Sequence, residues 1–156
     1  MPLRARCQSL THADFPEVIE IPGRYRDVDA RRHINNIAIA EMFSEARSRF
    51  VRMLAADLDR MDGQFFVVGQ QAVLYFGEAR FPGRIDVGSG LFAIGRSSLR
   101  FGQGFFSNRH CVAIAEAVLV FSSQARAIPL PDGLRERAQR FVFTGTGPPR
   151  QLQPHD

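Results

Sequence analysis

Apolar residues recur every three or four positions over one long stretch of the chain, from Ile37 to about Met61. The residues that keep this spacing are Ile39, Phe43, Ala46, Phe50 and Leu54. Such a period places them on one stripe of an α-helix, with the charged residues mostly off it. Asn35 and Asn36 come just before, and either side chain could cap the free amides of the first turn. The pattern therefore predicts one long helix with an apolar face.

Strand-like segments lie on both sides of this helix in the sequence. Residues 17–28 are typical of one short strand, and Pro22 makes it an edge or bulged strand because proline cannot donate to a sheet ladder. After Gly63, four further strand-like stretches are separated by turn-forming residues, and they are residues 65–79, 84–95, 96–106 and 110–124. The pattern predicts an antiparallel sheet that follows the helix.

The last strand-like stretch has two different faces. Ala113, Ala115, Ala117, Leu119 and Phe121 share one face, whereas Glu116 interrupts the apolar residues of the other. Because an unpaired carboxylate is costly to bury, we expect the Glu116 face to be partly hydrated and the alanine face to pack against something large. A long helix lying on this sheet buries both surfaces, which is an α+β arrangement.

The length and composition are those of one ordinary globular domain. The chain has 156 residues, of which 45% are apolar and 23% charged. We expect a single domain over residues 1–143 and a disordered tail over 144–156. No apolar run is long enough to span a bilayer, and the first fifteen residues lack the apolar core of a signal peptide. We therefore expect a cytoplasmic protein that does not enter the membrane, and its two cysteines agree with that compartment.

The charge pattern bears on the choice of partner. All 20 basic residues are arginine, yet the net charge is only +4 and the arginines are scattered among acids. This balance can attract a phosphorylated small molecule, but it lacks the dense basic run of a nucleic-acid-binding arm. We expect no nucleic-acid partner.

The densest polar cluster is the segment of residues 24–36, where the first strand meets the helix. Asp27 and Asp29 would share one face of a strand, and His33 follows closely. The start of a helix offers unpaired amides and partial positive charge, which can stabilise an oxyanion while a nearby carboxylate attacks or activates water. On spacing alone, helix capping explains these residues at least as well. A metal site built on Asp27, Asp29 and His33 would need further ligands that the sequence does not supply, so we expect no metal and no cofactor.

At this segment the sequence resembles the 4-hydroxybenzoyl-CoA thioesterase-like acyl-CoA thioesterases of the hotdog superfamily. The residues that carry the resemblance are Arg24, Tyr25, Asp27, Asp29, His33, Ile34, Asn35, Asn36, Phe43, Glu45, Ala46 and Arg47. It extends over about residues 17–135, including the segment Gly95–Ser98, and so covers the whole domain. The resemblance implies a hotdog fold, in which a five-stranded antiparallel sheet wraps around one long helix.

The resemblance also implies roles for individual residues. Asp29 would be the catalytic carboxylate, acting as nucleophile or as general base, with His33 nearby and the backbone amide of Asn36 as oxyanion donor. Substrate contacts would come from Tyr25, Asn35, Arg96, Ser97 and Ser98, the last three near the phosphates of coenzyme A (CoA). The substrate would be a thioester of CoA or of an acyl carrier protein. The assembly would be a homodimer or a dimer of dimers, with each active site between subunits.

Two positions depart from the family pattern. Arg32 stands where the family usually has glycine, and Ile39 stands where it usually has tyrosine. If the glycine provides a positive φ, Arg32 predicts a locally different turn and a displaced Asn36 amide. Ile39 removes a hydroxyl from the helix face near the site.

Two other functions remain open at this stage. A hotdog protein can bind an acyl-CoA without hydrolysing it, because fold alone does not fix function. A hotdog hydratase or dehydratase would act on enoyl or hydroxyacyl thioesters and would need a separate acid and base, such as an Asp–His pair. Asp29 beside the helix start favours hydrolysis over binding alone. Asp29 with His33 leaves the hydratase open, and the overall signature of the motif favours hydrolysis over it.

Overall fold

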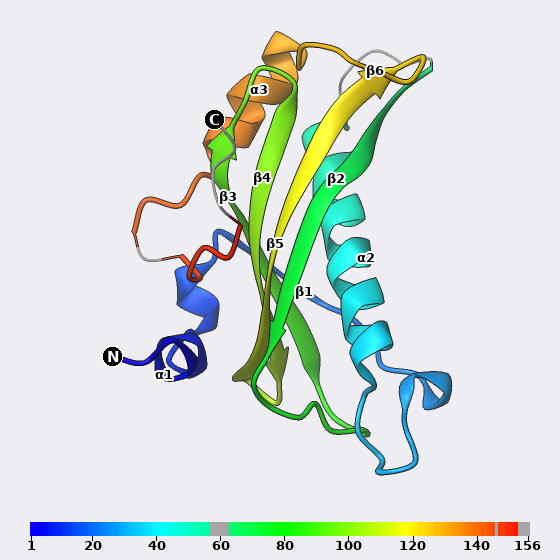
Figure 1. Cartoon of the computed structure of the whole chain (residues 1–156), viewed down its shortest axis with the longest axis vertical. Helices are drawn as coiled ribbons and strands as arrows, with labels where there is room; N and C mark the ends of the chain where they lie inside the picture. The colour runs from blue at the N-terminus through cyan, green and yellow to red at the C-terminus, as the bar shows by residue number, and fades with distance from the viewer. Residues whose placement is uncertain (57–62, 146, 153–156) are drawn as a thin grey trace.

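A computed structural model describes residues 1–56, 63–145 and 147–152. An antiparallel sheet curls around one long helix, α2, in the strand order β1-β3-β4-β5-β2, and the short β6 pairs with β5 (Figure 1). The strands are β1 (Glu17–Glu20), β2 (Gln64–Tyr75), β3 (Ile85–Ile94), β4 (Ser98–Ser107), β5 (His110–Ser123) and β6 (Arg126–Ala127). The α-helices are α1 (Leu3–Gln8), α2 (Asn36–Leu54) and α3 (Asp132–Gln139). The α+β arrangement that the sequence pattern predicted is confirmed.

Helix α2 begins where the two asparagines predicted. The side chain of Asn35 caps it, because Asn35 Oδ1 accepts a hydrogen bond of 2.8 Å from the backbone N–H of Ala38. The helix ends at Leu54, so the expected extension to about Met61 is too long, and residues 57–62 lie outside the described part. The predicted apolar stripe is buried along its whole length.

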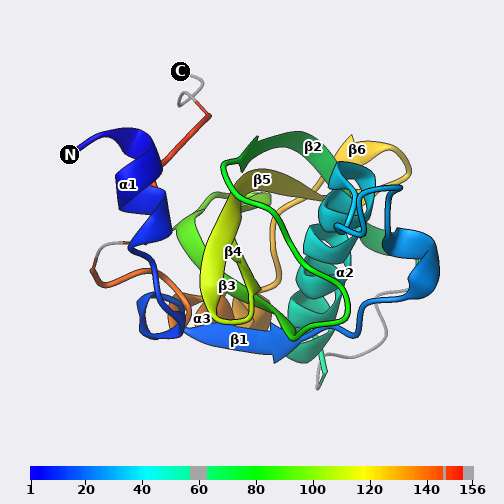
Figure 2. The same cartoon turned by 90° about the horizontal axis from the view of Figure 1, so that it is seen from below.

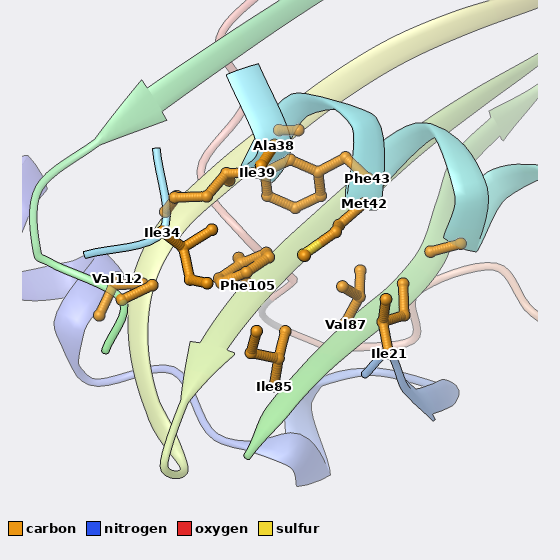
Figure 3. Close-up of a cluster of buried hydrophobic side chains, with 14 residues drawn as sticks. Ile21, Ile34, Ala38, Ile39, Met42, Phe43, Ile85, Val87, Phe105 and Val112 are labelled. Atoms are coloured by element: carbon orange, nitrogen blue, oxygen red, sulfur yellow. The ribbon is translucent and has the colours of Figure 1, made fainter. Parts of the chain in front are cut away.

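The concave face of the sheet packs on this stripe. Near the start of α2, Ile39 and Phe43 contact a cluster that includes Val87 and Phe105 from the sheet (Figure 3). The small side chains of β5 lie in the same core, and Ala113 is fully buried there. Small residues let a sheet approach a helix closely, so the prediction for the alanine face is confirmed.

A layer of buried polar side chains crosses this core at Arg47, between the two ends of α2. Arg47, only 1% exposed, donates from Nη1 to Gln103 Oε1 over 2.7 Å and from Nη2 to Gln71 Oε1. Gln103 Nε2 in turn donates to Ser89 Oγ at 2.9 Å and to the carbonyl of Phe43 at 3.2 Å. Burial lowers the pKa of Arg47 to about 10, because water no longer solvates its charge. The layer separates the apolar cluster around Phe43 from a second one further along α2.

The opposite, convex face of the sheet is covered in part by α1, which lies across the sheet from α2 (Figure 2). Glu116 lies on this face and is fully buried, so hydration of its carboxylate is not observed, whereas Val118 and Val120 further along the same face are partly exposed. Glu116 Oε2 accepts the backbone N–H groups of Gln151 at 2.6 Å and Leu152 at 2.9 Å, and Arg100 Nε lies 3.3 Å from Oε1. These partners offset the cost of burying the charge. The disorder expected for residues 144–156 stays a prediction.

The first predicted strand is shorter than expected. β1 ends at Glu20, before Pro22, and residues Tyr25–Asp27 form a 3₁₀ helix in place of the expected strand. Asp27 and Asp29 therefore do not share a strand face. The prediction of an edge strand is confirmed, since β1 is one edge of the sheet and β2 is the other. Within the described residues, no helix is long and apolar enough to cross a membrane.

Candidate active site

The segment of residues 24–36 forms a tight loop that leads directly into α2. The backbone N–H of Asp29 donates to the carbonyl of His33 over 2.9 Å, and Val28 pairs with Ile34 as a β-bridge. The N–H of Ile34 donates to the carbonyl of Ala79 over 2.8 Å, which ties the loop to the connection between β2 and β3. The loop is therefore held from within and from one neighbouring segment.

The carboxylate of Asp29 lies in the middle of this loop. Its Oδ1 accepts backbone hydrogen bonds from Arg31 at 2.8 Å and from His33 at 3.1 Å. The hydrogen bond from His33, with smaller contributions from Arg31, holds the pKa of Asp29 below its usual value. Among the described residues no donor engages Oδ2. Asp29 is thus ionised at neutral pH, fixed through one oxygen and open at the other.

Arg32 takes the backbone conformation that glycine usually provides. Its φ is +63°, and its N–H donates to the carbonyl of Asp29 over 3.0 Å. The locally different turn expected from the missing glycine is therefore wrong. Arginine accepts the left-handed conformation at some cost in strain.

Asp27 has a different environment from Asp29. It is 3% exposed, and its two oxygens are held by the guanidinium and the backbone N–H of Arg24 at 2.9 to 3.1 Å. Burial raises its pKa, but the hydrogen bonds from Arg24 outweigh this effect and lower the pKa below its usual value. The carbonyl of Asp27 also accepts the N–H of Asn35 at 2.8 Å. Asp27 holds the loop in shape, and both of its carboxylate oxygens are occupied.

His33 supports Asp29 through its backbone, whereas its ring faces elsewhere. The ring Nε2 lies 3.3 Å from Glu78 Oε2, and Arg31 Nη2 lies 3.4 Å from the other oxygen of the same carboxylate. The chain offered no sequence signal for Glu78, because it lies on the connection after β2, far from the motif in sequence. Asp29 and the His33 ring do not form a hydrogen-bonded pair.

Asn36 is the first residue of α2, and its backbone N–H has no acceptor among the described residues. The N–H groups of Ala38 and Ile39 do have acceptors, because the first donates to Asn35 Oδ1 and the second to the carbonyl of Asn35. The carbonyl of Asn36 accepts a hydrogen bond of 3.0 Å from the hydroxyl of Tyr75. Tyr75 thus supplies a hydroxyl at the helix start although Ile39 replaces the family tyrosine and is itself buried in the core.

A hollow of about 530 Å³ opens beside Asp29. Its walls are formed by Tyr25, Val28, Asp29, Arg32, Phe81 and Pro82. The ring of Tyr25 meets the ring of Phe81 edge to face, with centroids 5.2 Å apart. The sequence motif predicted Tyr25 here but not Phe81 and Pro82, which come from the loop between β2 and β3 and carry no motif. The lining of the hollow thus combines apolar residues with the charged residues Asp29 and Arg32.

The residues expected near the CoA phosphates lie at the opposite end of α2 from Asp29. Arg96 and Ser97 lie in the turn between β3 and β4, and Ser98 begins β4. This turn is beside the C-terminal end of α2, while Asp29 lies beyond the N-terminal end (Figure 1). The helix between these ends has 19 residues and so spans roughly 28 Å. Within one chain the structure does not bring the two parts of the expected site together.

The sequence profile of the thioesterase-like superfamily matches residues 24–138, from the start of the Asp29 loop to the last helix. The chain belongs to this superfamily. Its fold is the hotdog fold, as the resemblance implied, and solved hotdog thioesterases have the same sheet around one helix. No curated protein matches the chain.

Several solved structures match over most of this thioesterase-like chain. A thioesterase from Thermus thermophilus, complexed with coenzyme A and Zn, is 30% identical, with a TM-score of 0.71 over 80% of this chain and 98% of its own. The PA5185 protein from Pseudomonas aeruginosa is 22% identical, with a TM-score of 0.77 over 87% and 98%. A DHNA-CoA thioesterase from Staphylococcus aureus is 19% identical, with a TM-score of 0.63 over 73% and 78%. The last two show the fold alone.

Proposed function

We propose that this protein hydrolyses the thioester of an acyl-CoA, or of an acyl carrier protein, to a free acid and a thiol. The observation that carries the proposal is the geometry of Asp29, a carboxylate held through one oxygen with the other open to a hollow. The thioester carbonyl would accept the free N–H of Asn36, where the start of α2 stabilises negative charge. Asp29 would then attack the carbonyl carbon or activate the water that attacks it.

The environment of Asp29 supports hydrolysis over the two alternatives. A hydratase or dehydratase needs a second proton-transfer group, but the ring of His33 is directed at Glu78 and not at Asp29. A protein that only binds acyl-CoA needs the hollow but not an ionised carboxylate in its wall. The match to a CoA-bound thioesterase supports an acyl-CoA as substrate.

The proposed active protein is a homodimer, joined through the β2 edge. This strand has 12 residues, no described strand pairs with its outer side, and it exposes Phe65, Val67 and Val68. Long apolar edges of this kind are normally covered. Two β2 strands that pair antiparallel across a two-fold axis place the β3–β4 turn of one subunit beside the Asp29 end of the other. Arg96, Ser97 and Ser98 could then contact the CoA of the neighbouring site, as the resemblance implied.

The test is release of free thiol from a panel of acyl-CoA substrates by wild type and by Asp29→Asn. The variant should fold normally, since Asn Oδ1 still accepts from Arg31 and His33, and should lose at least about a hundredfold in kcat/KM. Asp14→Asn is the matched control, because Asp14 also accepts local hydrogen bonds, from Thr11, but lies in the short 3₁₀ helix His12–Asp14 before β1. Equal turnover by wild type and Asp29→Asn would rule out the proposed role.

A further inference from the structure

We propose that Arg32 determines substrate specificity by binding an anionic oxygen group of the thioester within the hollow beside Asp29. This inference rests on the proposed function of the site. Arg32 stands in the wall of the hollow, next in the chain to residues that hold the carboxylate. A guanidinium offers several donors in a planar arrangement that suits carboxylate and phosphate oxygens.

The strained backbone conformation of Arg32 indicates that its side chain has a functional role. Arg32 has a φ of +63°, where glycine would be free of strain. The other non-glycine residues with positive φ in the described ranges are Asn108, Arg109, Gln124 and Ala125, and all four lie in two-residue turns between paired strands. Arg32 lies in the loop of the candidate active site. An arginine there costs backbone strain without improving the turn, so we infer that the guanidinium provides the compensating benefit.

The guanidinium of Arg32 is free to bind a ligand, unlike those of two neighbours. Arg31 reaches Glu78 at 3.4 Å, and Arg24 holds Asp27 at 3.1 Å. Among the residues that the structure describes, no carboxylate pairs with Arg32, Asp29 included. The positive charge of Arg32 is therefore not used to neutralise the catalytic carboxylate.

The rest of the hollow strengthens such an interaction. Tyr25, Phe81 and Pro82 present apolar surface on its walls. When a ligand fills the space between them and excludes water, the attraction between Arg32 and an anionic group grows because the local dielectric falls. A thioester joins an acyl group to a thiol such as CoA, and whichever of the two enters this hollow supplies the anionic oxygens. These belong either to a carboxylate on the acyl group or to the phosphates of CoA.

The experiment measures binding of three non-hydrolysable thioethers by isothermal titration calorimetry. They are S-(4-carboxybutyl)-CoA, S-pentyl-CoA of the same chain length, and S-(4-carboxybutyl)-pantetheine, which lacks the CoA phosphates. Wild type is compared with Arg32→Gly, which removes the side chain and suits the positive φ. Arg109→Gly is the matched control, since Arg109 has a φ of +70° in the β4–β5 turn and does not line the hollow.

If Arg32 binds an acyl carboxylate, Arg32→Gly weakens both carboxybutyl ligands by roughly tenfold to a hundredfold and leaves S-pentyl-CoA unchanged. If it binds CoA phosphate, the same loss appears for both CoA ligands and not for the pantetheine. The unfolding midpoint of Arg32→Gly should be no lower than that of wild type, which excludes unfolding as the cause. The proposal is overturned if Arg32→Gly binds all three ligands like wild type, or if Arg109→Gly shows the same losses. Thiol release by wild type tests the proposed function separately, because these binding measurements need no turnover.

Discussion

Asp27 and Arg24 form a two-point contact, with Nη2 of the guanidinium 3.1 Å from Oδ1 and Nε 3.1 Å from Oδ2. Asp29, two residues further on, accepts backbone hydrogen bonds from Arg31 and His33 instead. The two acids of one motif thus have separate tasks. Asp27 fixes the loop, and Asp29 presents a carboxylate to the hollow.

The first prediction concerns the buried acid. Asp27→Asn should lower the free energy of unfolding by about 1.5–3 kcal/mol, because a partly buried contact between two charged groups is replaced by one to a neutral amide. Asp29→Asn should leave it nearly unchanged, since that side chain is exposed. Denaturant unfolding followed by circular dichroism measures both. Equal loss of stability in the two variants would contradict the separate tasks.

The second prediction concerns the pH dependence of hydrolysis. The hydrogen bond from His33 lowers the pKa of Asp29, so its reactive, ionised form persists below the usual aspartate pKa of about 4. We expect kcat/KM to stay level from neutral pH down to about pH 5 and to fall only near pH 4 or below. A pH–rate profile on one acyl-CoA measures this. An acid limb centred between pH 6 and 7 would instead point to a histidine as the essential base.

The third prediction concerns the polar layer. Arg47→Ala should destabilise the protein by about 2–4 kcal/mol, because it leaves Gln103 Oε1 buried without its donor and opens a cavity in the core. Arg49→Ala is the control from the same helix, since Arg49 is exposed and pairs with Glu45 on the helix surface. That variant should cost no more than about 0.5 kcal/mol. Chemical denaturation of the two variants gives both values, and similar costs would contradict the importance of the layer.

The fourth prediction concerns the proposed dimer. Val68 is 54% exposed on the edge strand β2, so Val68→Lys should leave the subunit folded but place a charge where two edges would pair. We expect a shift from dimer to monomer in light scattering coupled to size-exclusion chromatography, with loss of hydrolysis. Leu3→Lys adds the same charge at a 48% exposed position on α1 and should leave the dimer intact. An unchanged dimer in Val68→Lys would place the interface elsewhere.

Local patterns predicted those parts of the fold that depend on periodicity. The apolar stripe from Ile39 to Leu54 defined α2, and the alternation along residues 113–121 identified the face of β5 that packs on it. The helices α1 and α3 were missed because each is short and gains its burial from the sheet. Glu116 was misplaced because its partners, Gln151 and Leu152, lie in a tail with no periodic pattern.

For the candidate site too, the sequence predicted what is local in the chain and missed what comes from distant segments. The motif around Asp29 is contiguous, so residues 24–36 could be identified as one unit from the sequence. Phe81 and Glu78 could not, because they reach the site only after β2 has run the length of the sheet and returned the chain to the start of α2. The turn at Arg32 was misjudged because sequence does not show that arginine adopts a positive φ there.

The polar layer through Arg47 and Gln103 divides the interior into two compartments with different freedom to vary. Its hydrogen bonds join α2 to the sheet and fix how the helix is aligned along it, whatever apolar residues fill the space on either side. Residues such as Ile39 and Met42, on the side near Asp29, can therefore change size while the far compartment keeps its packing. Such a division lets the packing beside the start of α2 vary while the half of the core that contacts α3 stays unchanged.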